Sequence, residues 1–292
     1  MYHIHLFVFF TTLLFSLTRP VVSSAEIREK PHQNGYHIKT IVIDPGHGAH
    51  DPGARGRTSV EKDIALQIAL KLGKAIKADL KDVNVIYTRT TDVFVPLYER
   101  IGLANDKKAD LFISIHCNSM PKIKKRVVSG YKRRNGKRLP IYKTVYVPNT
   151  TTRGTETFVS GYGRLSEQDA AIRENASMLL EENYQENYDG FDPKDPESYI
   201  IFSLMKNAYR DQSIKLASLV ESEYVKSDRE SRGVKELSLA VLARAGMPAI
   251  LTEVGFISNP NEERYLNSAA GQETIVSNLL KAIKNYKQQV EQ

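Results

Sequence analysis

Short apolar runs alternate with longer amphipathic segments along most of the chain. The first run, residues 41–43, leads into a loop rich in glycine and proline, and residues 61–80 then place their apolar side chains on one face of a predicted helix. A strand at 83–88, a helix at 96–107 and a strand at 110–116 continue the pattern. This β-α-β-α-β order predicts a largely parallel sheet with right-handed crossovers.

The second half of the chain repeats this alternation after a polar interruption. The expected elements are a strand at 154–159, a helix at 166–188, a long helix at 198–226, strands at 237–243 and 249–254, and helices at 261–266 and 273–287. We therefore expect an α/β fold, with a single domain over residues 37–290 and a mostly parallel, twisted sheet of about six strands with helices on both faces.

The interruption, residues 120–153, differs from the rest of the chain in charge. Residues 121–153 contain 11 Lys or Arg and no Asp or Glu, and apolar and polar residues alternate late in the segment, which predicts a hairpin. The formal net charge of +7 is therefore local, and a globally basic nucleic-acid binder is a poor interpretation. The segment is either a solvated β-arm or a patch for an anionic polymer.

The N-terminus is typical of an exported protein. Residues 6–17 are apolar and small residues follow, which predicts a signal peptide over 1–25 and a short leader over 26–36. No Lys or Arg precedes the apolar run, so a short uncleaved anchor is the alternative, although the run is too short for a stable transmembrane helix. Cys117 is the only cysteine, which excludes an intramolecular disulfide, and we expect it to be a small buried side chain.

Ionisable residues lie at or just after the carboxyl ends of three of the predicted strands. His47 follows the first strand, His116 ends the strand at 110–116 and Glu253 lies near the end of the strand at 249–254, while Glu61 begins the first helix. The carboxyl ends of parallel strands meet at one edge of a sheet, where ligands bind. Two imidazoles and one carboxylate form a known catalytic zinc site, and a second carboxylate can carry a proton. Spacing alone leaves open which glutamate binds the metal.

The sequence also resembles a known family. The matching blocks, in family order, are IVIDPGHGAHDPGARG, VEKDIAL, VIYTRTTDVFVPLYERIGLAN, ADLFISIHCNS, GTETFV and AILTEVGFISNPNEERYL. They resemble the zinc-dependent N-acetylmuramoyl-L-alanine amidases of the type-3 group, which cut peptidoglycan between the glycan and its stem peptide. The resemblance extends from residue 40 to about residue 286 and makes residues 37–290 the expected catalytic domain.

The resemblance implies a role for each candidate residue. His47, Glu61 and His116 would bind Zn²⁺, and Glu253 would be the general acid and base. Asp44 and Asn118 would support the ligands or orient substrate, with stabilisation of the loops as the alternative. The rival function classes are another exported zinc peptidase or amidohydrolase, and a non-catalytic wall-binding module.

A second insertion, residues 163–197, resembles a feature of division-associated members of the family. In those proteins a helical insertion blocks the zinc site until an activator protein moves it. The polar helix expected here contains Glu174, Glu181 and Glu182, and we expect Glu174 to be the inhibitory carboxylate. An ordinary surface helix is the alternative. The implied setting is the periplasm or the cell wall, during wall remodelling or cell division.

Overall fold

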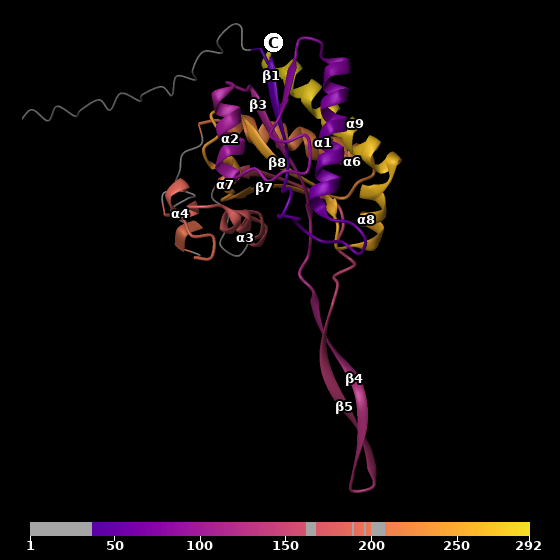
Figure 1. Cartoon of the computed structure of the whole chain (residues 1–292). Helices are drawn as coiled ribbons and strands as arrows, with labels where there is room; N and C mark the ends of the chain where they lie inside the picture. Colours follow the sequence, from indigo (N-terminus) through magenta and orange to yellow (C-terminus); the bar gives the residue numbers. More distant parts are fainter. Residues whose placement is uncertain (1–36, 162–167, 189, 196, 200–207) are drawn as a thin grey trace, which may run out of the picture. The chain divides into compact units, whose positions relative to one another are not determined.

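The computed structural model describes residues 37–161, 168–188, 190–195, 197–199 and 208–292 (Figure 1). The predicted signal peptide and leader lie outside these ranges. No helix among the described residues combines the length and the apolar character that crossing a bilayer requires.

A six-stranded sheet forms the centre of the domain, in the order β2-β1-β3-β8-β6-β7. Its strands are β1 (Thr40–Pro45), β2 (Asn84–Tyr87), β3 (Leu111–Asn118), β6 (Thr155–Ser160), β7 (Ser231–Leu237) and β8 (Ala249–Phe256). Every neighbouring pair is parallel except β6 and β8, which are antiparallel. The predicted mostly parallel α/β sheet is confirmed.

Both faces of the sheet are covered, which explains the continuous apolar runs of its central strands. On β3, Ile113 and Ile115 pack into the core under α1 (Glu61–Asp79), α6 (Arg210–Lys226) and α9 (Ala269–Val290). Phe112 points to the opposite core, under α2 (Leu97–Asp106) and α7 (Ala240–Ala243). Each fully buried side chain of this size stabilises the fold by about 1.5–3 kcal/mol.

Other predicted features of the core and the C-terminus are also present. Cys117 is 1% exposed and belongs to the first of these cores, so the expectation of a small buried side chain is confirmed. The two C-terminal helices are α8 (Pro260–Asn267) and α9, which is longer than expected at both ends.

The basic segment forms a hairpin of its own. The strands β4 (Ile123–Arg134) and β5 (Lys137–Val147) pair only with each other and leave the six-stranded sheet as a long ribbon (Figure 1). Asn135 and Gly136 form the turn, with φ values of 51° and 74°. Two positive φ values in an Asn-Gly pair are typical of the type I′ turn, whose twist matches that of the flanking strands. The predicted hairpin is confirmed, and we call residues 123–147 the arm.

The predicted strand at 237–243 is wrong. The strand β7 ends at Leu237, and residues 240–243 form the short helix α7, whose first three residues are buried. β7 is an edge strand with mostly half-buried side chains, so its own apolar pattern is weak. The apolar run that follows it fills the core beside α2 instead.

Two predicted helices are interrupted. Within the expected helix at 166–188, the described residues form α3 (Asp169–Asn175), a 3₁₀ turn (Ala176–Leu180) and α4 (Tyr184–Asn187). Asn183 adopts a left-handed φ of 55°, which breaks helical continuity. Of the helix expected at 198–226, α6 covers only Arg210–Lys226, and residues 200–207 lie outside the described ranges.

Candidate metal centre

His47 stands on the loop that follows β1, in a backbone conformation fixed by two arginines. Its φ is 61°, which is uncommon for a residue with a side chain. Arg100 donates to the carbonyl oxygens of Pro45 and His47, each at 2.8 Å, and Arg89 donates to that of Gly46 at 2.7 Å. Both guanidinium groups are buried, so they hold this loop at the carboxyl end of β1.

Gly46 allows the two candidate histidines to approach each other. A Cβ atom built at this position would lie 2.4 Å from Cε1 of the His116 ring, which is closer than real Cβ atoms come. The rings of His47 and His116 lie edge to face with their centroids 4.9 Å apart. Any larger residue at position 46 would therefore push His116 out of place.

His116 and Glu253 are brought together by the strand register. They are paired partners in the parallel ladder of β3 and β8, so their side chains leave the same face of the sheet. Glu253 in turn pairs with Glu156 across the antiparallel contact of β8 and β6. His116 is 5% exposed and Glu253 is completely buried.

Glu61, the first residue of α1, connects both histidines. One carboxylate oxygen lies 3.0 Å from Nδ1 of His116 and accepts from the Cys117 amide at 2.8 Å. The other lies 3.2 Å from Nε2 of His47 and accepts from the Ala54 amide at 2.7 Å. Both oxygens are thus aimed by backbone donors at the two rings, although α1 itself begins without a side-chain cap.

Glu174 completes the cluster from the inserted segment. Its Oε2 lies 2.9 Å from Nδ1 of His116 and 3.3 Å from Nε2 of His47. One side-chain atom each from His47, Glu61, His116 and Glu174 lies within 4.8 Å of the others, and all four residues are buried. The structure therefore brings Glu174 against the three predicted ligands.

The donor set of this cluster fits Zn²⁺. Both oxygens of Glu253 are buried without a hydrogen-bond partner in the described part of the chain, and His47 Nε2 and Glu174 Oε2 lie 3.3 Å apart without the geometry of a hydrogen bond. Such groups are rare, because leaving one unsatisfied costs about 1–3 kcal/mol. Imidazole nitrogens and carboxylate oxygens are the ligands that zinc prefers alongside thiolates.

Electrostatic coupling within the cluster favours ionised carboxylates. Burial alone would raise the pKa of Glu61, but the neighbouring histidines lower it to about 2. Burial likewise opposes the charged form of His116, and Glu174 and Glu61 nevertheless raise its pKa to about 10. A cluster with this much negative potential attracts a cation, whether protons on the imidazoles or a metal ion.

The pKa of Glu253 is shifted in the opposite direction to that of Glu61. Burial comes first and the charges of Glu174 and Glu61 add to it, and together they raise the pKa of Glu253 well above its usual range. A carboxyl with a raised pKa in a closed site, next to groups that bind metal, has the environment of a proton carrier.

Asp44 and Asn118, the two predicted supporting residues, have different surroundings. Asp44 is completely buried and accepts from Thr88, Arg100 and Ser114 at 2.6–2.8 Å, so it acts on His47 through Arg100. Asn118 accepts from Arg173 at 2.7 Å and donates to Glu156 at 3.2 Å. Asp44 is thus enclosed by protein groups, whereas Asn118 contacts the inserted segment that faces the cluster.

Three residues of the site were not predicted from the sequence. Asp51 binds Nδ1 of His47 at 2.8 Å, which fixes Nε2 as the ring nitrogen that faces the cluster, and it also accepts from Ser177 at 2.6 Å. Arg173 contacts Asn118. The spacing of four residues between His47 and Asp51 was a usable signal for the first, but Ser177 and Arg173 reach the site only through tertiary packing.

Comparisons with known proteins show which family the chain resembles. Residues 41–285 match the family model described as N-acetylmuramoyl-L-alanine amidase. The chain is 30% identical to the amidase AmiC of Escherichia coli over 84% of its own length and 52% of that protein, and 28% identical to AmiA of Escherichia coli over 85% and 76%. It thus spans about half the length of AmiC.

A solved structure shows the same fold. The crystal structure of an N-acetylmuramoyl-L-alanine amidase from Clostridium difficile covers 86% of this chain and 97% of its own, with 27% identity and a TM-score of 0.57. With a family model that matches almost all of the described domain, the chain belongs to the N-acetylmuramoyl-L-alanine amidase family.

Proposed function

We propose that the protein is a zinc-dependent hydrolase that cuts the amide bond between N-acetylmuramic acid and L-alanine in peptidoglycan, in wall remodelling or daughter-cell separation. The observation that carries the proposal is the joint placement of three buried ligand groups, His47, Glu61 and His116, beside a buried free carboxyl, Glu253. Family membership supports the choice of bond. The predicted signal peptide supports a site of action in the periplasm or at the wall.

His47, Glu61 and His116 would hold the metal ion. When bound, Zn²⁺ supplies a Lewis acid that polarises the amide carbonyl and makes water more acidic. Asp51 keeps Nε2 of His47 turned toward the ligand position, and the amides of Ala54 and Cys117 do the same for the two oxygens of Glu61. These contacts fix the ligand set before the metal arrives, which reduces the cost of ordering it.

Glu253 would move the proton. Its register with His116 directs the carboxyl to the same face of the sheet, and no hydrogen bond within the described residues holds either oxygen. It can take a proton from the attacking water and return it to the amine of L-alanine as the amide bond breaks. Burial keeps this carboxyl away from bulk solvent, so its proton is passed within the site.

Glu174 would keep the enzyme silent until an activator protein moves the inserted segment. Its carboxylate occupies the space between the two histidines. Several further hydrogen bonds fasten the same segment, among them those from Arg173 to Asn118, from Ser177 to Asp51 and from the Leu97 amide to Glu181. A small number of polar contacts of this kind can supply the few kcal/mol that hold about 99% of molecules closed.

The bond that is cut decides between this proposal and a different zinc hydrolase. Mass spectrometry of peptidoglycan digested by the zinc-loaded protein should show free stem peptides that begin with L-alanine. Chelation should abolish release and added zinc should restore it. His47→Ala should abolish both metal binding and release, while the exposed neighbour His50→Ala is the matched control and should keep both. Cleavage within the peptide instead would reject the proposed substrate bond.

The self-inhibition proposal has its own test. Glu174→Ala should raise the basal rate of wall digestion, because it empties the position between the histidines. Glu182→Ala removes an exposed carboxylate from the same segment and should leave the rate unchanged. Unchanged or lower activity of a folded, zinc-loaded Glu174→Ala protein would reject self-inhibition and leave the proposed reaction untouched.

A further inference from the structure

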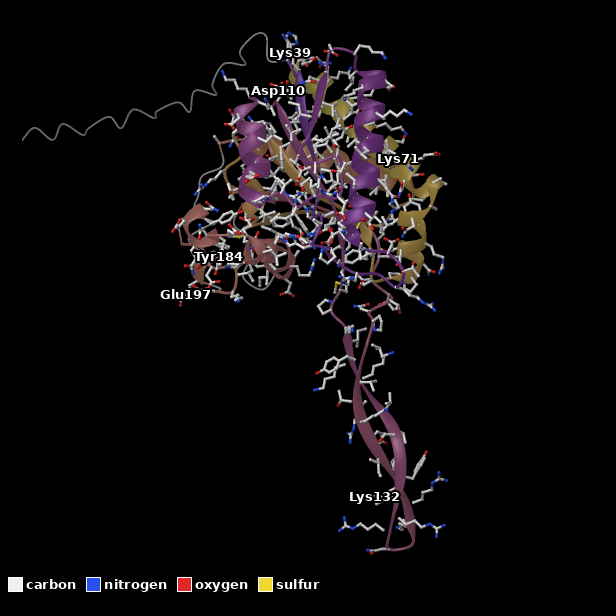
Figure 2. All side chains as sticks on the ribbon, in the orientation of Figure 1. Lys39, Lys71, Asp110, Lys132, Tyr184 and Glu197 are labelled. Carbon is white, nitrogen blue, oxygen red and sulfur yellow. The ribbon has the colours of Figure 1, made fainter. Side chains whose placement is uncertain are left out.

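The arm presents a dense row of cations and no acid along its whole length. Lys or Arg occupies nine positions of residues 123–147, and all nine side chains are exposed. Figure 2 shows these side chains directed outward along the ribbon, with Lys132 near its far end. Five large apolar or aromatic side chains on the same arm are more than 40% exposed: Val128, Tyr131, Ile141, Tyr142 and Tyr146.

The strand register sorts these side chains onto two faces. One face carries Arg126, Tyr142, Tyr131 and Arg138, and the guanidinium groups lie over the rings, Arg126 at 4.3 Å from the Tyr142 centroid and Arg138 at 3.9 Å from that of Tyr131. A guanidinium stacked on a ring keeps its in-plane N–H groups free to bind a carboxylate or phosphate. The arginines are therefore held open for an anionic ligand.

The opposite face is also basic, and this decides which kind of partner fits. Lys125, Lys132 and Lys143 lie there among aliphatic residues such as Ile141. A hairpin that lies in a bilayer surface needs one apolar and one polar face, as interfacial helices do, and the arm has cations on both. Cations on both faces along an extended rod match a long, flexible polymer with repeated anionic groups.

An isolated two-stranded hairpin is marginally stable in water, so a ligand that bridges both strands would also order it. The arm joins the domain close to the metal centre, since only four residues separate the end of β3 from the start of β4. Its base is fastened to the β8–α8 connection by the Met120 amide on Ser258 and by Asn259 on the Thr152 carbonyl. A polymer held by the arm is therefore tethered to the molecule that carries the site.

We propose that the arm is a second binding surface for peptidoglycan and that it recognises the carboxylates of the stem peptides. This inference rests on the proposed function, which brings the same polymer to the metal centre. Attachment through the arm raises the local concentration of cleavable bonds without any contact to the scissile amide. The tyrosine rings add flat apolar surfaces against which sugar rings can pack.

Binding is tested with the full chain carrying Glu253→Gln, so that the polymer stays intact. The protein is pelleted with purified peptidoglycan from which covalently attached polymers have been removed. Replacing Arg126, Arg133 and Arg138 by Gln should weaken retention by about tenfold or more at low salt, because it removes three of the nine cations that would attract the anionic polymer. Replacing three exposed lysines of the domain, Lys74, Lys215 and Lys281, by Gln removes the same charge and should change retention less than twofold. Equal retention of the two triple variants would overturn the inference.

The chemistry of the ligand is tested by two further samples. Raising salt from low to physiological concentration should release most of the protein, since exposed charges are screened over about 8 Å at 0.15 M. Amidation of the peptidoglycan carboxylates should abolish retention. Retention that survives amidation, or retention by phosphatidylglycerol vesicles with none by peptidoglycan, would overturn the assignment.

Activity assays separate this inference from the proposed function. The active protein with the arm shortened by joining Ile123 to Val147 through an Asn-Gly turn should cleave a soluble muramoyl peptide as the parent does and digest insoluble wall several-fold more slowly. Equal digestion of insoluble wall would overturn the role of the arm. No cleavage of either substrate by the zinc-loaded Glu174→Ala protein, in which the proposed block is removed, would instead reject the proposed reaction.

Discussion

The domain and the arm treat charged side chains in opposite ways. β3 is buried at every position, and the buried charges beside it include the ion pair of Asp44 with Arg100 and the carboxyl of Glu253, whose oxygens have no hydrogen-bond partner among the described residues. β4 begins after a connection of four residues, and none of the cations on the arm forms an ion pair within the described part of the chain. Buried charge fixes a geometry because its loss is costly. Exposed charge costs the fold little and remains available to a partner.

The largest effect is expected on turnover, at the buried carboxyl that we propose as the proton carrier. Glu253→Gln should lower turnover by about 10²–10⁴-fold, because it removes the proton carrier and keeps the shape of the side chain. Metal content should stay at one equivalent, measured by elemental analysis beside the rate. His116→Ala is the paired variant and should lose metal. If Glu253→Gln loses metal and His116→Ala keeps it, the two roles are exchanged.

The next largest effect is expected on stability, at a buried ion pair that supports the fold without taking part in the proposed reaction. Asp44→Asn leaves the buried guanidinium of Arg100 without its ion-pair partner, and we expect the free energy of unfolding to fall by about 3 kcal/mol. Denaturant unfolding measures the change. The exposed pair of Lys284 with Asp79 is the control, since Asp79→Asn should cost less than about 1 kcal/mol. Equal losses for both would remove the distinction between buried and exposed pairs.

A smaller, pH-dependent effect is expected at Glu221 of α6. Burial raises the pKa of this carboxyl, and hydrogen bonds from Ser231, Thr157 and Thr155 lower it only in part. The folded state therefore holds a proton that the unfolded state releases, so the group destabilises the fold progressively as pH rises above the ordinary glutamate range. Glu221→Gln should raise Tm by a few degrees at pH 8 and hardly at pH 4. A gain that is the same at both values would contradict this linkage.

The smallest effect on stability is expected on the arm. Replacing Arg126, Arg133 and Arg138 by Gln should change the free energy of unfolding of the domain by less than about 0.5 kcal/mol, because these side chains are exposed and unpaired with acids. Thermal unfolding of the triple variant beside the parent measures this. A large loss of stability would mean that the arm supports the domain, and the contrast between the two regions would fail.

The sequence predicted the central strands and the two histidines of the candidate metal centre because both have strong local signals. β1 and β3 contain continuous apolar runs, and His47 lies on the loop after β1 while His116 lies near the end of β3. The strand at 237–243 was wrong because its alternation belongs to a short buried helix, whereas the true edge strand β7 is half polar and contains Gly233 with a φ of 84°. The periodicity of apolar residues reflects burial, and the side chains of an edge strand are only partly buried, so such a strand has a weak pattern.

The contacts of the inserted segment show a second limit of prediction from the sequence. Glu174 was predicted as an inhibitory carboxylate from a resemblance, but its distances to the two histidines depend on how a broken helix folds back over the sheet. The bonds of Ser177 and Arg173 have no local pattern at all. Such partners are determined by packing between distant parts of the chain, which a single sequence does not display.

The junction between the arm and the domain is a site where an inserted segment can be exchanged. Ile123 and Val147 stand opposite each other in the ladder, so the chain leaves and returns at neighbouring points. Loop length at such a junction adds only slowly to the entropy of closure. A foreign domain whose termini lie side by side can therefore replace the arm without displacing the sheet.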